Sequence, residues 1–146
     1  MDGAVEVVLV EDNPDDIALT LRGLRRAGLV NHIEVLRDGA EALQFFLGRG
    51  ASTPRPMVIL LDLQLPKVDG LQVLERLRAD PRTQTLPVVI LTASRQERDL
   101  VESYRSGINH YIAKPVDFPQ LAAVVQQLGL YWLLLNQPPR PVDLTA

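Results

Sequence analysis

Acidic residues stand directly after two apolar stretches of this 146-residue sequence. Glu11 and Asp12 follow the run AVEVVLV (residues 4–10), and Asp62 closes the run MVILLD (57–62). Aliphatic, β-branched runs of this kind are typical of buried strands. Carboxylates brought within about 4 Å of each other repel by about 1 kcal/mol in water, and by more in a partly desolvated cleft. If these three groups converge, they require a cation or a bound proton.

An oxygen-only set of donors favours Mg²⁺, which is typically held by one or two carboxylates together with a substrate phosphate. We therefore expect a phosphate in the same site. Lys114, which ends the run HYIAK (110–114), offers a mobile positive charge to a phosphoryl oxygen. The hydroxyl of Thr92, which ends VVILT (88–92), can donate a hydrogen bond to another. Asp62 is then the natural nucleophile, because carboxylates form aspartyl phosphates while a metal shields the incoming charge.

These residues share one site only if the strands that carry them end at the same edge of a β-sheet. Asn13 and Pro14 supply a helix cap and a first helical residue, and Asp38 with Glu41 has capping-box spacing. The pattern predicts strands over residues 4–10, 32–36, 57–62, 88–92 and 110–114. Helices are predicted over residues 14–27, after Asp38, and over 70–79, 95–106 and about 118–135. This alternation indicates an α/β fold with a parallel sheet, in which ligands bind at the carboxyl ends of the strands.

Composition and charge narrow the possible partners. The chain has no cysteine, which excludes disulfides and thiolate metal sites and fits a reducing cytoplasm. The net charge is −3 and no Lys/Arg stripe with interleaved aromatics occurs, so we expect no nucleic-acid partner. The apolar runs are far shorter than the ~20 residues of a membrane-spanning helix, so we also expect no membrane partner. A soluble cytoplasmic protein that binds another protein or a small molecule is predicted.

Four strings resemble, in order and spacing, the landmarks of the receiver domain of two-component response regulators: VEDNPDD, LLDLQLPKVDG, VVILTAS and YIAKPVD. The resemblance covers about residues 5–135 and implies one receiver domain with a Pro-rich tail at 136–146. It implies a flavodoxin-like (βα)5 fold, a doubly wound parallel sheet with strand order 2-1-3-4-5. The strings SYRSGINHYIAKPVDF and YWLLL are similar to single-domain, CheY-like regulators that partner bacterial phytochromes.

The same resemblance implies roles for individual residues. Asp62 would accept a phosphoryl group from a histidine of a sensor kinase, for which a phytochrome is the candidate. Thr92 and Lys114 would contact that group. Mg²⁺ would be held by Asp12, Asp62 and the backbone carbonyl of Gln64, with Glu11 assisting through water. The Lys114–Pro115 bond would be cis. The protein would be a signalling switch that takes part in its own phosphorylation and dephosphorylation, rather than an enzyme acting on other substrates.

Several residues have both a structural and a functional interpretation. Tyr111 is either a packing residue of a short strand or a switch whose ring turns inward when Thr92 moves toward the phosphoryl group. A basic patch on the first helix is either a solvated face or the place where the kinase docks; it consists of Arg22, Arg25 and Arg26. His32 and His110 lack ligand spacing, and we expect them to be structural.

Two other functions use the same features. An aspartyl-phosphate phosphohydrolase would share the nucleophile, but such enzymes carry a second aspartate two residues later, where this chain has Gln64. A pseudo-receiver that serves only as a scaffold would be expected to lack one of the five site residues, and all are present. A phospho-accepting switch is therefore the preferred hypothesis.

The last predicted helix suggests self-association. Its inward stripe consists of Leu121, Val124, Val125 and Leu128, yet the helix continues through the apolar run LYWLLL at 130–135. At 3.6 residues per turn, that run covers every side of the helix, whereas one domain buries only one side. We expect a homodimer through helix 4, strand 5 and helix 5, with Tyr131, Trp132 and Leu134 in the interface. The alternative is that the tail NQPPRPV folds over these side chains.

Overall fold

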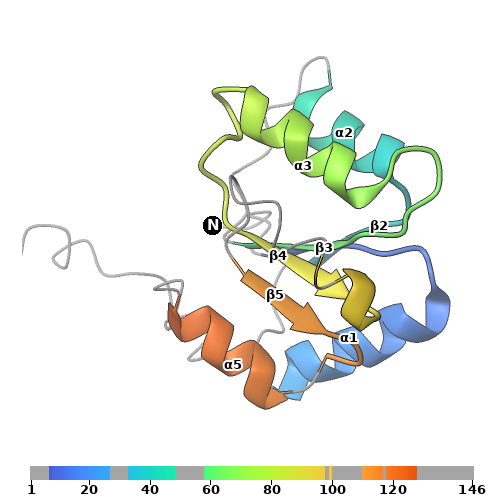
Figure 1. The fold of residues 1–146 in the computed structure, drawn as a ribbon, viewed down its shortest axis with the longest axis vertical. Coiled ribbons are helices and arrows are strands. Elements are labelled where there is room, and N and C mark those ends of the chain that lie inside the picture. The colour runs from blue at the N-terminus through green and yellow to red at the C-terminus, as the bar shows by residue number, and fades with distance from the viewer. Residues whose placement is uncertain are drawn as a thin grey trace, which may run out of the picture.

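A five-stranded parallel sheet forms the centre of the molecule, with strand order β2-β1-β3-β4-β5 (Figure 1). The computed structural model describes residues 7–26, 33–48, 58–97, 99, 110–116 and 118–127. The strands are β1 (Val7–Val10), β2 (Ile33–Leu36), β3 (Val58–Asp62), β4 (Val88–Thr92) and β5 (His110–Ala113). The predicted flavodoxin-like topology is confirmed. In this order the carboxyl ends of β1 and β3 are neighbours, and between these two strands the chain changes the side of the sheet on which it adds the next strand.

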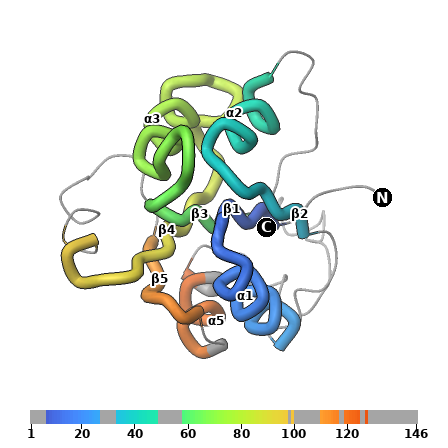
Figure 2. The backbone as a smooth tube through the Cα atoms, turned by 90° about the vertical axis from the view of Figure 1, so that its right-hand side faces the viewer, coloured from blue at the N-terminus to red at the C-terminus, as the bar shows by residue number. Residues whose placement is uncertain are grey.

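Helices cover both faces of the sheet. They are α1 (Pro14–Arg26), α2 (Gly39–Leu47), α3 (Gly70–Ala79) and α5 (Phe118–Gln127). Helices α2 and α3 pack together on one face, and α1 and α5 pack together on the other, as the two perpendicular views show (Figures 1 and 2). No helix among the described residues is long and apolar enough to cross a membrane.

The strands are buried on both faces, so their residues alternate between two hydrophobic clusters. One cluster joins Leu9, Leu60 and Leu91 to side chains of α1 and α5, including Ile17, Leu24 and Leu121. The other joins Val8, Ile59 and Ile90 to side chains of α2 and α3, including Phe46, Val73 and Leu77. Burial of this kind, at roughly 25 cal/mol per Å² of apolar surface, fixes the register of the strands and thus where each strand ends.

Polar caps determine where the helices begin. Asn13 Oδ1 accepts hydrogen bonds from the backbone N–H groups of Asp15 (2.9 Å) and Asp16 (3.0 Å) at the start of α1. Asp38 caps α2 as predicted, but Glu41 accepts from the N–H of Arg37 rather than from that of the cap residue. These caps place the first turn of α1 directly after the end of β1.

The predicted boundaries agree closely with the structure in the described ranges. The prediction for β5 was one residue too long: it ends at Ala113, although the Lys114 N–H still donates to the Thr92 carbonyl at 2.8 Å. The Lys114–Pro115 bond is cis, as expected, and Pro115 has no N–H with which to extend the ladder. Most of the predicted 95–106 helix lies outside the described residues, as do the end of the last helix and the predicted interface residues Tyr131, Trp132 and Leu134.

Candidate functional site

Three carboxylates converge at the carboxyl edge of the sheet, as the sequence predicts. Val10 pairs with Leu61, so the residues that follow them on neighbouring strands, Glu11 and Asp62, lie side by side. One carboxylate oxygen from each of Glu11, Asp12 and Asp62 lies within 4.8 Å of the others. Glu11 and Asp62 are buried, whereas Asp12 is exposed. The cluster is therefore accessible from the side on which Asp12 lies.

Lys114 reaches this cluster from the end of β5. Its Nζ lies 2.8 Å from Glu11 Oε1 and 3.1 Å from Asp62 Oδ1. A third carboxylate, that of Asp16 in the first turn of α1, lies 3.2 Å from the same nitrogen. Only 13% of the Lys114 side chain is exposed. The ammonium group thus offsets part of the negative charge that the strand ends bring together.

The protonation of Asp62 follows from these surroundings. Burial raises the pKa of Asp62 to about 7, and the negative charge of Glu11 acts in the same direction, whereas Lys114 opposes both. Burial by itself lowers the pKa of Lys114, but its hydrogen bond to Glu11 and the charge of Asp62 outweigh burial and raise it above its usual value. The lysine is therefore charged at neutral pH, while Asp62 is near its point of half-ionisation in the metal-free protein.

Thr92 and Tyr111 are not members of the carboxylate cluster, and Tyr111 pairs with Ile90, two residues before Thr92 on β4. Thr92 is buried, and its hydroxyl donates to the carbonyl of Ile112 on the neighbouring strand at 3.5 Å. Tyr111 is half-buried and packs against the hydrophobic cluster on the α2 and α3 face. The packing interpretation of Tyr111 thus has direct support, and its role as a switch stays a prediction.

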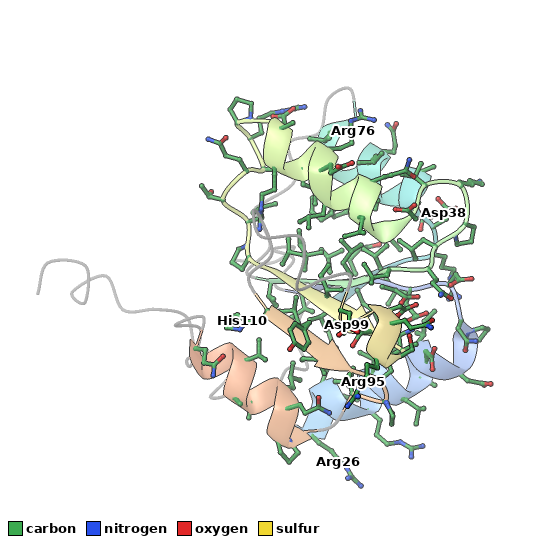
Figure 3. The ribbon with its side chains drawn as sticks, in the orientation of Figure 1. Arg26, Asp38, Arg76, Arg95, Asp99 and His110 are labelled. Carbon is green, nitrogen blue, oxygen red and sulfur yellow. The ribbon has the colours of Figure 1, made fainter. Side chains whose placement is uncertain are left out.

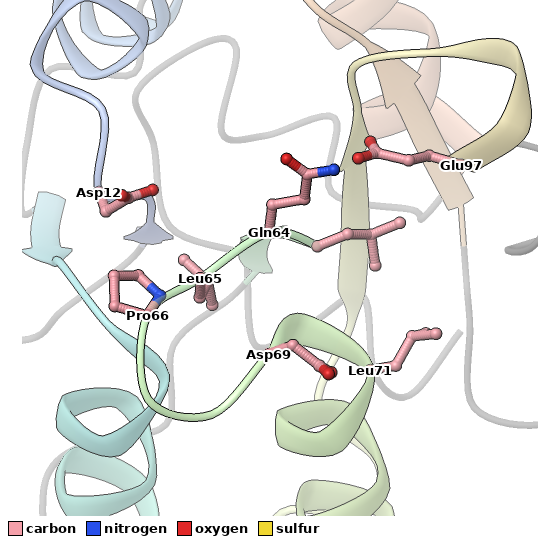
Figure 4. A pocket seen from close by; sticks show the side chains of 8 residues that line it. Asp12, Gln64, Leu65, Pro66, Asp69, Leu71 and Glu97 are labelled. Atoms are coloured by element: carbon pink, nitrogen blue, oxygen red, sulfur yellow. The ribbon is translucent and has the colours of Figure 1, made fainter.

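A pocket of about 500 Å³ opens next to the carboxylates. Asp12 lines it together with residues of the β3–α3 loop, among them Gln64, Leu65, Pro66 and Asp69 (Figure 4). The side chain of Gln64 extends toward that of Glu97 in this view. Asp12 and Gln64 therefore line one solvent-accessible space, whereas Asp62 and Lys114 are not among its lining residues.

Sequence reasoning missed two acidic residues near this edge. Asp16 contacts Lys114, and Glu97 Oε1 accepts a hydrogen bond of 2.7 Å from the N–H of Ala93, next to Thr92. A signal was available for Asp16: a helix that begins right after the acidic end of β1 must hold its first turn at that edge. Glu97 stands three residues after Ser94, whose hydroxyl accepts a hydrogen bond from the Glu97 N–H. This capping-box spacing is visible in the sequence and would have placed Glu97 at a helix start next to Thr92.

Other candidate residues lie away from the cluster. His110 is the first residue of β5, at the opposite end of that strand from Lys114 (Figure 3). It therefore takes no part in the site, as predicted, and His32 lies outside the described residues. The predicted basic patch lines a separate groove of about 510 Å³ on α1, with Ala18, Leu21, Arg22, Arg25 and Arg26 around it. Arg26 extends from the end of this helix away from the sheet (Figure 3).

The donor set fits a hard divalent cation. Carboxylate oxygens are the ligands that Mg²⁺ and Mn²⁺ accept, and the pocket leaves room for the waters that Mg²⁺ retains. Three carboxylates with one adjacent ammonium group leave an excess of negative charge, which such an ion would neutralise. Asp12 and Asp62 would bind it directly, and Glu11 is placed to accept a hydrogen bond from a water on the ion.

Comparison with known proteins agrees with this geometry. Residues 7–126 match the family model of the response regulator receiver domain. The probable methanogenesis regulatory protein FilR2 of Methanothrix harundinacea is 40% identical over 136 residues, which are 92% of this chain and 88% of FilR2. The response regulator Rcp1 of Synechocystis sp. is 37% identical over 129 residues, which are 87% of this chain and 88% of Rcp1.

Solved structures show the same fold. The bacteriophytochrome response regulator RtBRR is 44% identical, with a TM-score of 0.81 over 98% of this chain and 88% of RtBRR. AtBRR, also a bacteriophytochrome response regulator, is 45% identical, with a TM-score of 0.79 over 92% of this chain and 99% of AtBRR. Rcp1 has been solved in a Mn²⁺-bound form, at 36% identity and a TM-score of 0.68 over 92% of this chain and 99% of Rcp1. Receiver-domain relatives thus bind divalent cations on this fold.

Proposed function

This chain belongs to the response regulator receiver domain family, and we propose that Asp62 is the residue on which it accepts a phosphoryl group. The observation that carries this assignment is the position of Asp62 between Lys114, at 3.1 Å, and the carboxylates of Glu11 and Asp12. Among the residues that the structure describes, Asp62 alone combines a central-strand terminus with both a cation partner and a metal-binding arrangement. Receiver domains work with sensor histidine kinases, and the phosphoryl donor is a phosphohistidine of such a kinase.

The transfer needs an ionised Asp62 carboxylate. One of its oxygens forms the new bond to phosphorus, the bond from phosphorus to the histidine nitrogen breaks, and that nitrogen keeps the electron pair. Lys114 holds a positive charge next to the acceptor oxygen and can follow the phosphoryl oxygens as they arrive. Glu11 is buried at the centre of the cluster and keeps Lys114 directed toward Asp62.

We propose Mg²⁺ as the cofactor, held by Asp12, Asp62 and the backbone carbonyl of Gln64, with Glu11 acting through water. When bound, the ion shields the negative charge of the carboxylates from the incoming phosphoryl group. Support comes from the convergence of the three carboxylates and from the exposure of Asp12 to the pocket that Gln64 also lines.

The response is assigned to Thr92 and Tyr111. The Thr92 hydroxyl exchanges its 3.5 Å hydrogen bond to the Ile112 carbonyl for a phosphoryl oxygen, and Tyr111 then moves from its half-buried position. The long distance of that hydrogen bond supports an easy exchange. The signal leaves through the surface of the receiver, and a phytochrome-linked kinase is the proposed partner because RtBRR and AtBRR are bacteriophytochrome response regulators.

The competing functions have weaker support. A phosphohydrolase would need a general acid near Asp62, and the residue two positions later is Gln64, whose amide does not release a proton. A scaffold would not need Lys114 buried among carboxylates, an arrangement that costs desolvation. The protein is accordingly a switch rather than an enzyme with an external substrate.

We further propose that the chain forms a homodimer through helix 4, strand 5 and helix 5, with Tyr131, Trp132 and Leu134 in the interface. This proposal depends on the apolar run at 130–135: as a continuation of the predicted last helix, it would cover every side of that helix, whereas one domain buries only one side.

Phosphotransfer from purified histidine kinases tests the acceptor assignment. The wild-type chain should gain an acid-labile label that requires Mg²⁺, and Asp62→Asn should gain none. Asp15→Asn, an exposed aspartate in the first turn of α1, is the matched control and should be labelled like wild type. Undiminished labelling of Asp62→Asn, or an acid-stable label, would contradict the assignment.

A further inference from the structure

Among the described residues that pair with Lys114, Asp16 is the one that does not belong to the metal-binding group. Its Oδ2 accepts a hydrogen bond of 3.2 Å from Lys114 Nζ across 98 positions of sequence. Its backbone is held in the first turn of α1, because the Asp16 N–H donates to the Asn13 side chain. Its side chain is 33% exposed, compared with 1% for Glu11 and 5% for Asp62. Asp16 is therefore the partner best able to turn away into solvent.

The ammonium group of Lys114 lies among three carboxylates, and its contact to Asp16 has the geometry of a hydrogen bond. A lysine offers three N–H donors, and three carboxylates, those of Glu11, Asp16 and Asp62, lie within 3.2 Å of Nζ. A phosphoryl oxygen that binds Lys114 competes with these carboxylates for the N–H donors of the ammonium group. Glu11 and Asp62 are buried and belong to the metal-binding group, so the contact to Asp16 is the one that can be exchanged most easily.

From this geometry, and on the premise of the proposed function, we infer that Asp16 is a positioning residue that competes with the phosphoryl group for Lys114. In the resting protein, Asp16 draws the ammonium toward α1. This has two effects of opposite sign. It weakens the ion pairs of Lys114 with Glu11 and Asp62, which favours binding of a divalent cation by these carboxylates. It also opposes the phosphorylated state, because Asp16 occupies a donor of Lys114 and places a second negative charge near the phosphoryl group.

Substitution of Asp16 by Asn should therefore change the two ligands in opposite directions. With saturating Mg²⁺, beryllium fluoride, which imitates a phosphoryl group on an aspartate, should bind roughly two- to tenfold more tightly to Asp16→Asn than to wild type. Mg²⁺ alone should bind more weakly, because Lys114 then pairs more fully with the metal-binding carboxylates. A residue that only supports the fold would weaken both ligands when it is replaced.

Both affinities can be measured by titration calorimetry on the full chain. Asp15→Asn is the matched control, because it removes the same charge from the same helical turn without removing a Lys114 partner; its two affinities should change less than those of Asp16→Asn. Asp16→Glu keeps the carboxylate and should remain near wild type. If Asp16→Asn folds poorly, Asp16→Ser removes the charge with a residue that is favourable at a helix start.

A double-mutant cycle shows whether Asp16 acts through the lysine. In a Lys114→Met background, Asp16→Asn should alter Mg²⁺ affinity no more than Asp15→Asn does. Beryllium fluoride affinities that are equal in Asp16→Asn and Asp15→Asn, or a weaker affinity in Asp16→Asn, would overturn the inference. A wild-type chain that binds no beryllium fluoride with Mg²⁺ present would instead contradict the proposed function, and the inference would fail with it.

Discussion

At the scale of single residues, Asp62 has to satisfy opposing requirements. As a nucleophile and a metal ligand it must be ionised, but burial and the charge of Glu11 favour the protonated form. Lys114 shifts the balance toward ionisation, and a bound cation would shift it further. The affinity of the site for Mg²⁺ should therefore depend on pH in a range set by Asp62.

We predict that Mg²⁺ binding weakens as the pH falls below about 7, which is the pKa of Asp62. Below that value a proton occupies the carboxylate and must leave before the metal binds, so the affinity should fall by roughly tenfold per pH unit. Above it the carboxylate is already ionised and the affinity should level off. Calorimetry in two buffers of different ionisation enthalpy should detect proton release at pH 7 and almost none at pH 8.5.

The variant Asp62→Asn provides the control for this titration. It has no proton to release at this position, so any remaining Mg²⁺ binding should cause little proton release at pH 7. A wild-type affinity that stays constant between pH 6 and pH 8 is incompatible with the raised pKa.

Lys114 and Thr92 should serve the response more than the metal. Lys114→Ala and Thr92→Ala should each retain Mg²⁺ binding, and Lys114→Ala should bind it at least as tightly as wild type because a competing cation has gone. The metal-free Lys114→Ala protein should melt at a lower temperature, since two buried carboxylates lose their partner. Both variants should lose the spectral change that phosphorylation causes in the NMR spectrum of wild type. Loss of metal binding in Lys114→Ala with an intact response would reverse these roles.

At the scale of elements, the site depends on how the β3–α3 loop returns to the sheet. The Gly70 N–H donates to the Leu63 carbonyl at 2.8 Å, and the Gly70 Cα lies so close to β3 that a Cβ would stand 2.2 Å from the Asp62 carbonyl oxygen. At the other side of the loop, Gly39 at the start of α2 packs directly against Val68. Two glycines thus allow the loop that carries Gln64 to lie against the sheet and α2.

We predict that Gly70→Ala lowers the free energy of unfolding by about 1–3 kcal/mol, because backbone atoms of Asp62 and Leu63 must move to admit the methyl group. It should also reduce the rate of phosphotransfer at temperatures where the variant is fully folded. Urea denaturation and single-turnover labelling measure the two effects.

Gly23→Ala is the control at this scale. A Cβ there meets nothing nearer than 3.3 Å, and alanine favours the interior of α1 by about 1 kcal/mol, so the loss of stability should be smaller. Normal stability and normal phosphotransfer in Gly70→Ala would show that the loop does not need this close approach.

At the scale of the whole molecule, the functional edge and the predicted dimer segment belong to different parts of the chain. The carboxylates lie at the carboxyl ends of β1 and β3, whereas the apolar run at 130–135 follows α5. The predicted interface also includes strand 5 and helix 5, which are β5, the strand that carries Tyr111, and α5.

We predict a dimer at micromolar concentration in sedimentation experiments. Trp132→Glu, or a chain that ends at Gly129, should shift the equilibrium toward monomer, because the apolar surface that drives association is charged or absent. Leu19→Glu is a suitable control: it places the same charge on a hydrophobic side chain of α1 that is 43% exposed and does not belong to the run at 130–135. A folded wild-type chain that remains monomeric at high concentration, with and without beryllium fluoride, would exclude the dimer.

Much of the fold and the main members of the site could be predicted because they depend on patterns that are local in sequence. Apolar runs that end in Glu11, Asp62, Thr92 and Lys114 indicate buried parallel strands, and parallel strands present their carboxyl ends at one edge. Caps such as Asn13 and Asp38 mark the helix starts. For these features the sequence alone determined the element, its direction and the edge at which the reactive residues meet.

Only the tertiary structure decided how these residues pair. Lys114 could have faced any of the acidic groups at the edge, and its distances to Glu11, Asp16 and Asp62 depend on how α1 packs beside β5 and how far each strand extends. The direction of the Thr92 hydroxyl likewise depends on the nearest carbonyl of a neighbouring strand. Contacts between residues 98 positions apart, such as Asp16 and Lys114, are set by the packing of the whole sheet and its helices. A local sequence pattern does not determine the spatial distance between such residues.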